Sequence, residues 1–133
     1  MNNEILVVPK VLCICQAGCV RSVALAYTMK FEFSANAIAV GVDFVTDEEW
    51  PALLAWATDI FLVSHDVQAQ FHDTLKDLGI TDTPPQHLIN LGEDRWGMRK
   101  GPYNDQLLEL AYAKVQDSTW MRRYYPLQFS EGQ

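Results

Sequence analysis

The chain has 133 residues, of which 49% are hydrophobic and 20% charged, a composition typical of one soluble globular domain rather than of a disordered chain. Seventeen acidic against ten basic side chains give a formal net charge of −7, which argues against general attraction to nucleic acid or to an anionic membrane. No apolar run approaches the roughly 20 residues of a membrane span, and residues 1–10 lack the long apolar stretch of a signal peptide, so we expect a cytoplasmic protein.

The first predicted elements are a strand, a loop and a helix in immediate succession. Residues 10–15 are largely apolar, which is typical of a strand buried on both faces of a parallel sheet. A glycine-containing loop follows, and from Arg21 to Lys30 the apolar residues recur at helical spacing without a helix breaker. This succession is half of a βαβ unit.

The same alternation continues in the next third of the chain. Residues 37–40 predict a second strand. Thr46 and Glu49 have the spacing of a capping box, which predicts a second helix carrying Trp50, Leu53, Leu54 and Ala57. Residues 59–63 predict a third buried strand.

A third helix and a fourth strand are expected after that. Ser64 is a suitable N-cap for a helix that runs to Leu78, and Gly79 is placed to end it. Residues 81–86, with two prolines, predict a loop, and residues 87–91 predict the fourth strand.

The last helix is expected after a polar loop over residues 92–101. Pro102 suits its first turn, and its apolar residues are Leu107, Leu108, Leu110, Ala111 and Val115. Beyond residue 118 the helical pattern fades, so we expect residues 119–133 to form a loosely packed C-terminal tail.

The alternation of strands and helices predicts the fold class. It favours a single α/β domain over residues 1–133, with its core over about 10–116, built as a three-layer sandwich around a four-stranded parallel sheet. Ligands of such folds bind at the carboxyl ends of the strands. The first strand delivers Cys15 to that edge.

The segment from Cys15 to Ser22 predicts a phosphate-binding catalytic loop. Cysteine, five residues, arginine and serine lie between a buried strand and a helix, so peptide N–H groups can surround a phosphate and the helix N-terminus adds positive potential. Gly18 supplies backbone freedom, Arg21 offers a planar fork for two phosphate oxygens, and that positive environment favours the reactive thiolate of Cys15. The expected phosphate-binding residues are Gln16, Ala17, Gly18, Cys19, Val20, Arg21 and Ser22.

A simpler interpretation is that Cys15 ends a core strand as a small hydrophobic residue and Arg21 is solvated. Cys-x5-Arg occurs often by chance, and the strand, glycine, serine and helix around it favour the catalytic loop.

All three cysteines, Cys13, Cys15 and Cys19, fall within seven residues, which fits a reducing compartment and not a disulfide framework. We expect no metal, because zinc would require the distant, irregularly spaced His65, His72 or His87.

With these motifs the chain resembles the low-molecular-weight protein tyrosine phosphatases, especially their short bacterial relatives. The likeness covers about residues 10–116 and includes the loop after the first strand, Trp56–Val63 and Leu91–Trp96. It implies a flavodoxin-like sheet, a phosphocysteine intermediate on Cys15 and no cofactor. The sequence Gln16-Ala17-Gly18 departs from the family's loop and is closer to dual-specificity phosphatases, which however carry their loop late in a larger domain.

The resemblance also implies a general acid after the last strand. The family takes it from an Asp-Pro-aromatic stretch, and Asp94 has the expected position, with Trp96 two residues later but Arg95 in place of proline. A carboxylic acid near the nucleophile is the usual proton donor for the leaving oxygen. Glu93 and Asp105 are alternative acids.

Two aromatic residues and one cysteine are further candidates. Trp96 and Tyr103 are predicted to flank a phosphotyrosine ring, although a partly buried structural role is an equal alternative. Cys19 is placed to form a disulfide with Cys15 under oxidation, although the family's corresponding cysteine lies one residue later.

The function predicted from these residues is a phosphomonoesterase, most specifically a protein tyrosine phosphatase. Its expected ligands are a phosphorylated protein or small phosphomonoester, and anions such as phosphate, vanadate and sulfate; the sequence indicates no oligomeric state. The alternatives are a phosphate- or phosphotyrosine-binding module with little turnover, an arsenate reductase, which requires cysteines beyond Cys19, and a phosphocarrier.

Overall fold

Four parallel strands form one sheet in the order β2-β1-β3-β4. The structure is a computed structural model that describes residues 8–93, 96 and 101–123. Its elements are β1 (Lys10–Cys15), α1 (Arg21–Glu32), β2 (Asn36–Gly41), α2 (Glu49–Trp56), β3 (Asp59–Leu62), α3 (His65–Leu78), β4 (Gln86–Leu88) and α5 (Asp105–Gln116). The predicted alternation of strands and helices is thus confirmed.

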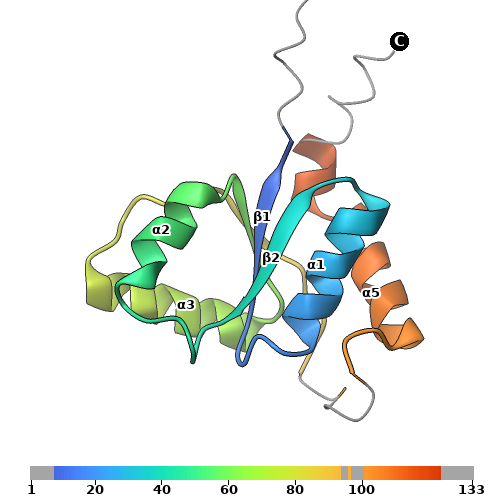
Figure 1. Cartoon of the computed structure of the whole chain (residues 1–133), viewed down its shortest axis with the longest axis horizontal. Coiled ribbons are helices and arrows are strands. Elements are labelled where there is room, and N and C mark those ends of the chain that lie inside the picture. The colour runs from blue at the N-terminus through green and yellow to red at the C-terminus, as the bar shows by residue number, and fades with distance from the viewer. Residues whose placement is uncertain (1–7, 94–95, 97–100, 124–133) are drawn as a thin grey trace, which may run out of the picture.

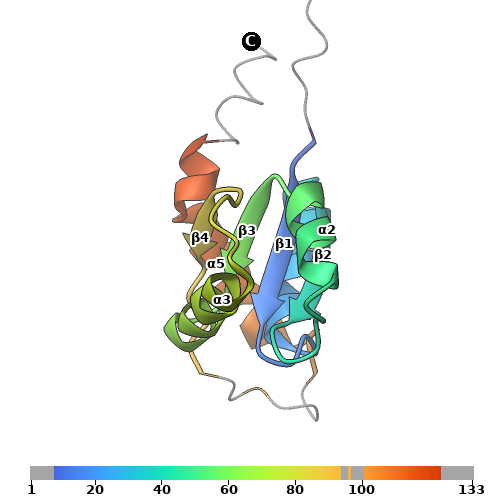
Figure 2. The ribbon, with the colours of Figure 1, turned by 90° about the vertical axis from the view of Figure 1, so that its left-hand side faces the viewer.

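The helices lie in two layers on opposite faces of this sheet (Figure 1). Helices α1 and α5 cover one face, and α2 and α3 cover the other, as the view turned by 90° also shows (Figure 2). The α/β prediction with a four-stranded parallel sheet is confirmed, and the strand order is consistent with a flavodoxin-like three-layer fold. None of the helices in the described residues has the length and apolarity needed to cross a membrane.

The core is centred on the two inner strands. In β1 every residue after Lys10 is buried, and all four residues of β3 are buried, which is why both segments are continuous apolar runs in the sequence. The largest fully buried side chains come from both layers and the sheet: Trp50, Trp120, Phe61 and Phe71. Strand order reverses at β1, whose successors β2 and β3 lie on its two sides, so the crevice expected of such folds is at the end of β1.

The predicted ends of α3 are confirmed, and the capping box of α2 is half formed. The Ser64 hydroxyl accepts a hydrogen bond from Val67 N–H at 3.3 Å, and Gly79 ends α3 in a left-handed conformation with φ 70°. Thr46 N–H donates to Glu49 Oε1 at 2.8 Å, which lowers the pKa of that carboxyl below its ordinary value. The Thr46 side chain does not cap α2, because a turn over residues 47–48 precedes the helix.

The last helix begins later than predicted, at Asp105 instead of Pro102. The Asn104 side chain accepts hydrogen bonds from the N–H groups of Gln106 and Leu107 at 3.0 and 3.1 Å, so asparagine, a strong N-cap, fixes the start and leaves Pro102 in a turn. The fourth strand is also shorter than predicted, although Ile89 N–H still donates to Leu62 O at 2.8 Å.

The expectation of a loosely packed tail over residues 119–133 is wrong for its first part. Residues 119–123 are helical, and Trp120 is completely buried. Its ring makes edge contacts with Phe33 and Phe61, at centroid distances of 6.0 and 5.9 Å. A single buried aromatic gives no periodic pattern, so the sequence did not indicate this packing. Residues 124–133 lie outside the described part.

A buried polar chain ties this C-terminal turn to the sheet. Asp59 Oδ1, which is fully buried, lies 2.9 Å from His87 Nε2, and His87 Nδ1 lies 2.6 Å from Thr119 Oγ1. The Asp59–His87 contact is the only close contact between a carboxylate and a basic side chain among the described residues. The first residue of β3, the middle residue of β4 and residues 119–123 are therefore joined at the end of the sheet opposite Cys15.

Candidate active site

Cys15 ends β1, at the strand-order reversal, and its sulfur has two polar partners. The Gly18 N–H donates to Cys15 Sγ at 2.9 Å, and the Ser22 hydroxyl lies 3.0 Å from the same sulfur. Cys15 is only 3% exposed, and Ser22 is fully buried. The predicted loop therefore folds around the Cys15 sulfur and places two hydrogen-bond donors where a thiolate can accept from them.

Helix α1 begins at Arg21 directly after this loop, with its N-terminus unneutralised. Val20 occupies the N-cap position without a side-chain hydrogen bond, and the first turn contains no acidic residue. By contrast, α2, α3 and α5 each have a capping side chain or an acidic first turn, supplied by Glu49, Ser64, Asp66, Asn104 and Asp105. The positive end of α1 is thus left to act on an anion in the loop.

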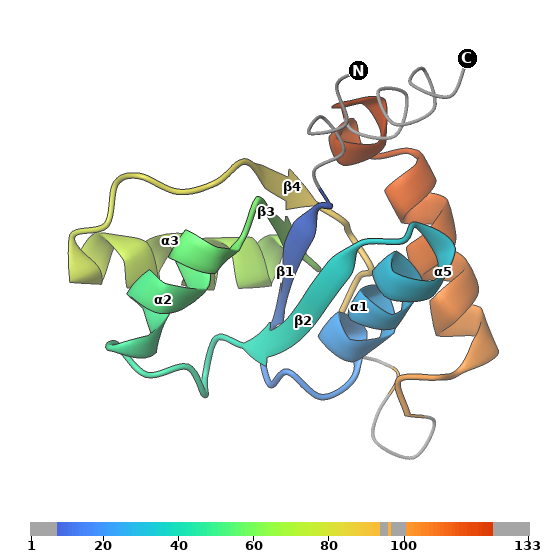
Figure 3. The same ribbon diagram turned by 45° about the horizontal axis from the view of Figure 1, so that its top comes forward.

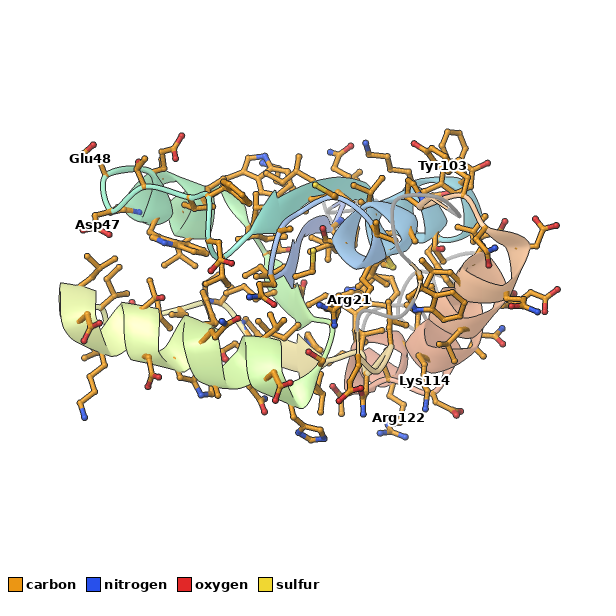
Figure 4. All side chains as sticks on the ribbon, turned by 90° about the horizontal axis from the view of Figure 1, so that it is seen from below. Arg21, Asp47, Glu48, Tyr103, Lys114 and Arg122 are labelled. Carbon is orange, nitrogen blue, oxygen red and sulfur yellow. The ribbon has the colours of Figure 1, made fainter. Side chains whose placement is uncertain are left out.

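Arg21, the first residue of α1 after the loop, is also buried, with only 4% of the residue exposed. Its Nη1 donates to the Gly92 carbonyl at 2.8 Å, and no carboxylate pairs with it in the part of the chain that the structure describes. Figure 4 shows Arg21 near the middle of the molecule, seen from the edge where the strands end. A buried cation without an anionic partner is costly, so this position favours an anionic ligand.

A tight turn after β4 presents the Gly92 carbonyl to Arg21. The Asn90 side-chain oxygen accepts from Gly92 N–H at 3.0 Å, and Gly92 has φ 78°. The segment that leads to the predicted general acid is therefore fixed to Arg21 at its beginning. Asn90 and Gly92 were not predicted as site residues, although asparagine two residues before a glycine is a recognisable turn signal.

Gly41 is a third residue of the site that was not predicted from the sequence. It lies opposite Cys15 in the parallel register, and the chain after it pairs with the loop: Val42 N–H donates to Cys15 O at 2.9 Å, and Asp43 N–H donates to Gln16 O at 3.0 Å. A Cβ atom on Gly41 would lie 2.3 Å from the Ala17 carbonyl carbon. The loop and the end of β2 thus approach more closely than any side chain permits.

Substitution Gly41→Ala should displace the loop and lower both activity and stability. Its Cβ would meet backbone atoms, so neither strand nor loop can relieve the contact by a rotamer change. We expect a loss of about 2 kcal/mol or more in the free energy of unfolding, the range for forced overpacking, and a weaker affinity for vanadate, measured by thermal unfolding and by inhibition. Gly79→Ala, which has φ 70° and nothing within 4 Å of its added Cβ, is the control for a glycine substitution that strains the backbone away from the loop, and it should leave the vanadate affinity unchanged. Unchanged vanadate affinity in Gly41→Ala would contradict this account.

The predicted general acid, Asp94, lies outside the described residues, as does Arg95. Of the two alternatives, Glu93 is exposed and lines a cavity of about 260 Å³ together with Ser64, His65, Asp66, Asn90 and Gly92. Asp105 is the first residue of α5, where a carboxylate interacts favourably with the helix N-terminus.

The two predicted aromatic walls differ in exposure. Trp96 is only 6% exposed and belongs to the core, so its ring does not stand free beside the loop. Tyr103 is 59% exposed, and its ring lies 5.2 Å from that of Tyr27 on α1. Tyr103 is therefore the one of the two that is open to a ligand.

The other two cysteines have distinct environments. Cys13 is completely buried in β1, and burial, with a smaller contribution from nearby Cys15, raises its pKa far above the ordinary value for a thiol. Cys19 is exposed, and its thiol donates to Ala17 O at 3.6 Å. All three cysteines are free thiols, and no group of three His, Cys, Asp or Glu residues is arranged to hold a metal within the described residues.

Comparisons with models of known protein families, with curated proteins and with solved structures give no match for this chain.

Proposed function

We propose that the protein is a cysteine-dependent phosphomonoesterase of the low-molecular-weight tyrosine phosphatase type, with phosphotyrosine as its substrate group. The observation that carries this proposal is the position of Cys15 and Arg21 at the two ends of one loop: a nucleophile with two polar contacts on its sulfur, and a buried guanidinium without a carboxylate partner in the described residues. A phosphate dianion supplies the missing negative charge and places phosphorus next to the sulfur.

The reaction proceeds in two displacements. Cys15 Sγ attacks phosphorus, the bond from phosphorus to the ester oxygen breaks, and Asp94 protonates the departing oxygen. Water, deprotonated by Asp94, then attacks the phosphocysteine, and phosphate leaves as the thiolate re-forms. Ser22 Oγ, 3.0 Å from the sulfur, donates a hydrogen bond that stabilises the departing thiolate. Arg21 and the loop amides neutralise the charge on the transferring phosphoryl group in both steps.

Two features support this phosphatase type over others with the same short motif. The loop follows β1, an inner strand at the point where strand order reverses, and it leads directly into α1. This loop position and a flavodoxin-like sheet are what the resemblance to low-molecular-weight phosphatases implies. The position of Gly18 three residues after Cys15, taken alone, favoured the dual-specificity enzymes. The cysteine content argues against the reductase alternative, because no cysteine follows Cys19.

Turnover and inhibition by an anion test the proposal. The wild-type protein should release phosphate from a phosphotyrosine peptide and from p-nitrophenyl phosphate without added metal, and vanadate should inhibit competitively, because it occupies the phosphate position. Rapid acid quenching with a ³²P-labelled substrate should leave the label on Cys15. If the phosphopeptide bound without being hydrolysed, the protein would be a binding module and not an enzyme. An absence of both binding and hydrolysis would reject the proposed site.

Carboxylate variants in the same experiment identify the acid. Asp94→Asn should reduce kcat about 100-fold on a phosphotyrosine peptide, which is the usual scale of general acid catalysis, and less on p-nitrophenyl phosphate, whose leaving group needs no proton. Glu93→Gln and Asp105→Asn are the matched controls and should retain activity on both substrates. A larger loss in either control would move the acid role to that residue.

A further inference from the structure

Three exposed rings form a continuous row on the helical layer of α1 and α5. Tyr27 and Phe31 lie one turn apart on α1, with ring centroids 4.6 Å apart, and the Tyr103 ring lies 5.2 Å from Tyr27. Phe31 is 69% exposed and Tyr103 is 59% exposed. We call these three residues the aromatic row. Contiguous exposed apolar surface of this kind often marks an interaction site.

A groove of about 310 Å³ between α1 and α5 adjoins the aromatic row. It is lined by Tyr27, Thr28, Glu32, Leu108, Glu109 and Tyr112. Its lining therefore combines apolar side chains with two carboxylates and contains no basic residue. Neither Glu32 nor Glu109 forms an ion pair in the described part of the chain. An occupant with both an apolar and a positively charged group complements this lining.

The aromatic row lies within reach of a peptide bound at Cys15. Helix α1 begins at Arg21, so Tyr27 and Phe31 lie roughly 9 and 15 Å further along its axis at 1.5 Å per residue. An extended peptide advances about 3.3 Å per residue, so three to five residues cover that distance. Both α1 and α5 begin at the edge of the sheet where Cys15 lies (Figure 3).

We propose that the aromatic row and the adjoining groove bind a basic and apolar segment of the substrate protein. The segment contains an arginine or lysine next to an apolar residue, three to five residues from the phosphotyrosine. Its cation lies over the rings and near Glu32 and Glu109, and its apolar side chain contacts Leu108. This inference rests on the proposed function, because the phosphotyrosine sets the position of the peptide.

The charge of the chain favours this occupant over two others. A second copy of the chain also carries a formal charge of −7, and an anionic membrane surface is negative, so both are repelled by the carboxylates of the groove. A basic peptide is attracted by the same charges and is steered toward the surface.

Matched phosphopeptides test the docking. Two peptides carry Arg-Leu four residues from phosphotyrosine, one on its N-terminal and one on its C-terminal side, and a third carries Gly-Ser at both places. We expect wild-type kcat/KM to be at least fivefold higher for one Arg-Leu peptide than for the Gly-Ser peptide, with a preference that declines in high salt. A preference below fivefold for both would overturn the proposal.

Variants locate the preference on the protein surface. The double variant Phe31→Ser/Glu109→Gln should reduce it to below twofold while turnover of p-nitrophenyl phosphate is unchanged. Glu48→Gln is the charge-matched control: Glu48 is exposed and lies at the end of the molecule away from Tyr103 (Figure 4), so its loss should leave the preference intact. Retention of the preference in the double variant, or its loss in Glu48→Gln, would overturn the proposed location.

Direct binding separates this inference from the proposed function. Fluorescence anisotropy with the unphosphorylated Arg-Leu peptide requires no turnover. The Kd of this peptide for the double variant should be at least threefold higher than its Kd for the wild-type protein. Binding that depends on Phe31 and Glu109 in a protein without phosphatase activity would support the docking surface and reject the enzyme. Hydrolysis of p-nitrophenyl phosphate without such binding would support the enzyme and reject the docking surface.

Discussion

Cys15→Ser should lower kcat/KM on phosphotyrosine substrates by a factor on the order of 10³ or more, the scale seen when a covalent nucleophile is removed. The serine hydroxyl replaces the sulfur in nearly the same volume, but it is not ionised near neutral pH and attacks phosphorus poorly. Steady-state hydrolysis of p-nitrophenyl phosphate and of a phosphotyrosine peptide measures this loss. Binding of the phosphopeptide should persist, because Arg21 and the loop amides are unchanged, and calorimetry measures it separately.

Cys13→Ala is the control for this substitution. Cys13 precedes Cys15 by two residues in β1 but is completely buried, and burial raises the pKa of its thiol, so it does not act as a nucleophile. The variant should retain most of the activity and lose only a little stability. If Cys15→Ser kept more than a tenth of the wild-type activity, the covalent mechanism would be wrong.

Asp59→Ala should cause a large loss of stability at the other end of the sheet. Removing one partner of a buried pair costs about 3–5 kcal/mol, because the remaining polar group stays buried without its partner. Here His87 Nε2 loses its acceptor at 2.9 Å, and His87 then no longer holds Thr119 in place. We expect Tm to decrease by roughly 10 °C or more for a domain of this size, measured by thermal unfolding.

Asp77→Ala is the matched control, since Asp77 is exposed in the last turn of α3 and forms no ion pair in the described residues. It should change Tm by less than about 2 °C, as surface substitutions usually do. In a double-mutant cycle, His87→Leu should cost little once Asp59 is replaced by leucine, because the two residues act as a unit. A decrease in Tm below 3 °C in Asp59→Ala would show that the pair contributes little to folding.

The elements that the sequence predicted well are those whose residues repeat one pattern. The strands β1 and β3 are continuous apolar runs buried on both faces. The ends of α3 were predictable because serine is a common N-cap residue and glycine readily adopts the left-handed conformation that ends a helix. The start of α5 was misplaced because two start signals compete within three residues, and the Asn104 side chain forms the actual cap.

The candidate site divides in the same way. Cys15, Arg21 and Ser22 were predicted because the chain itself brings them together in eight residues. Gly92 and Gly41 were not, because each contact depends on the sheet: Arg21 meets the Gly92 carbonyl 71 residues away, and Gly41 meets the loop only through parallel register with Cys15. A single sequence contains no local signal for such pairs.

The close approach of Gly18 and Gly41 gives a criterion for recognising this loop in other sequences. A Cβ on Gly18 would lie 2.7 Å from Gly41 N, and Gly18 also has φ 77°, so the two positions constrain each other and should co-vary among homologues. A homologue with the cysteine and arginine but a bulky residue at the position of Gly41 has a different loop path. Four positions, Cys15, Gly18, Arg21 and Gly41, therefore define a more selective signature than the short motif alone.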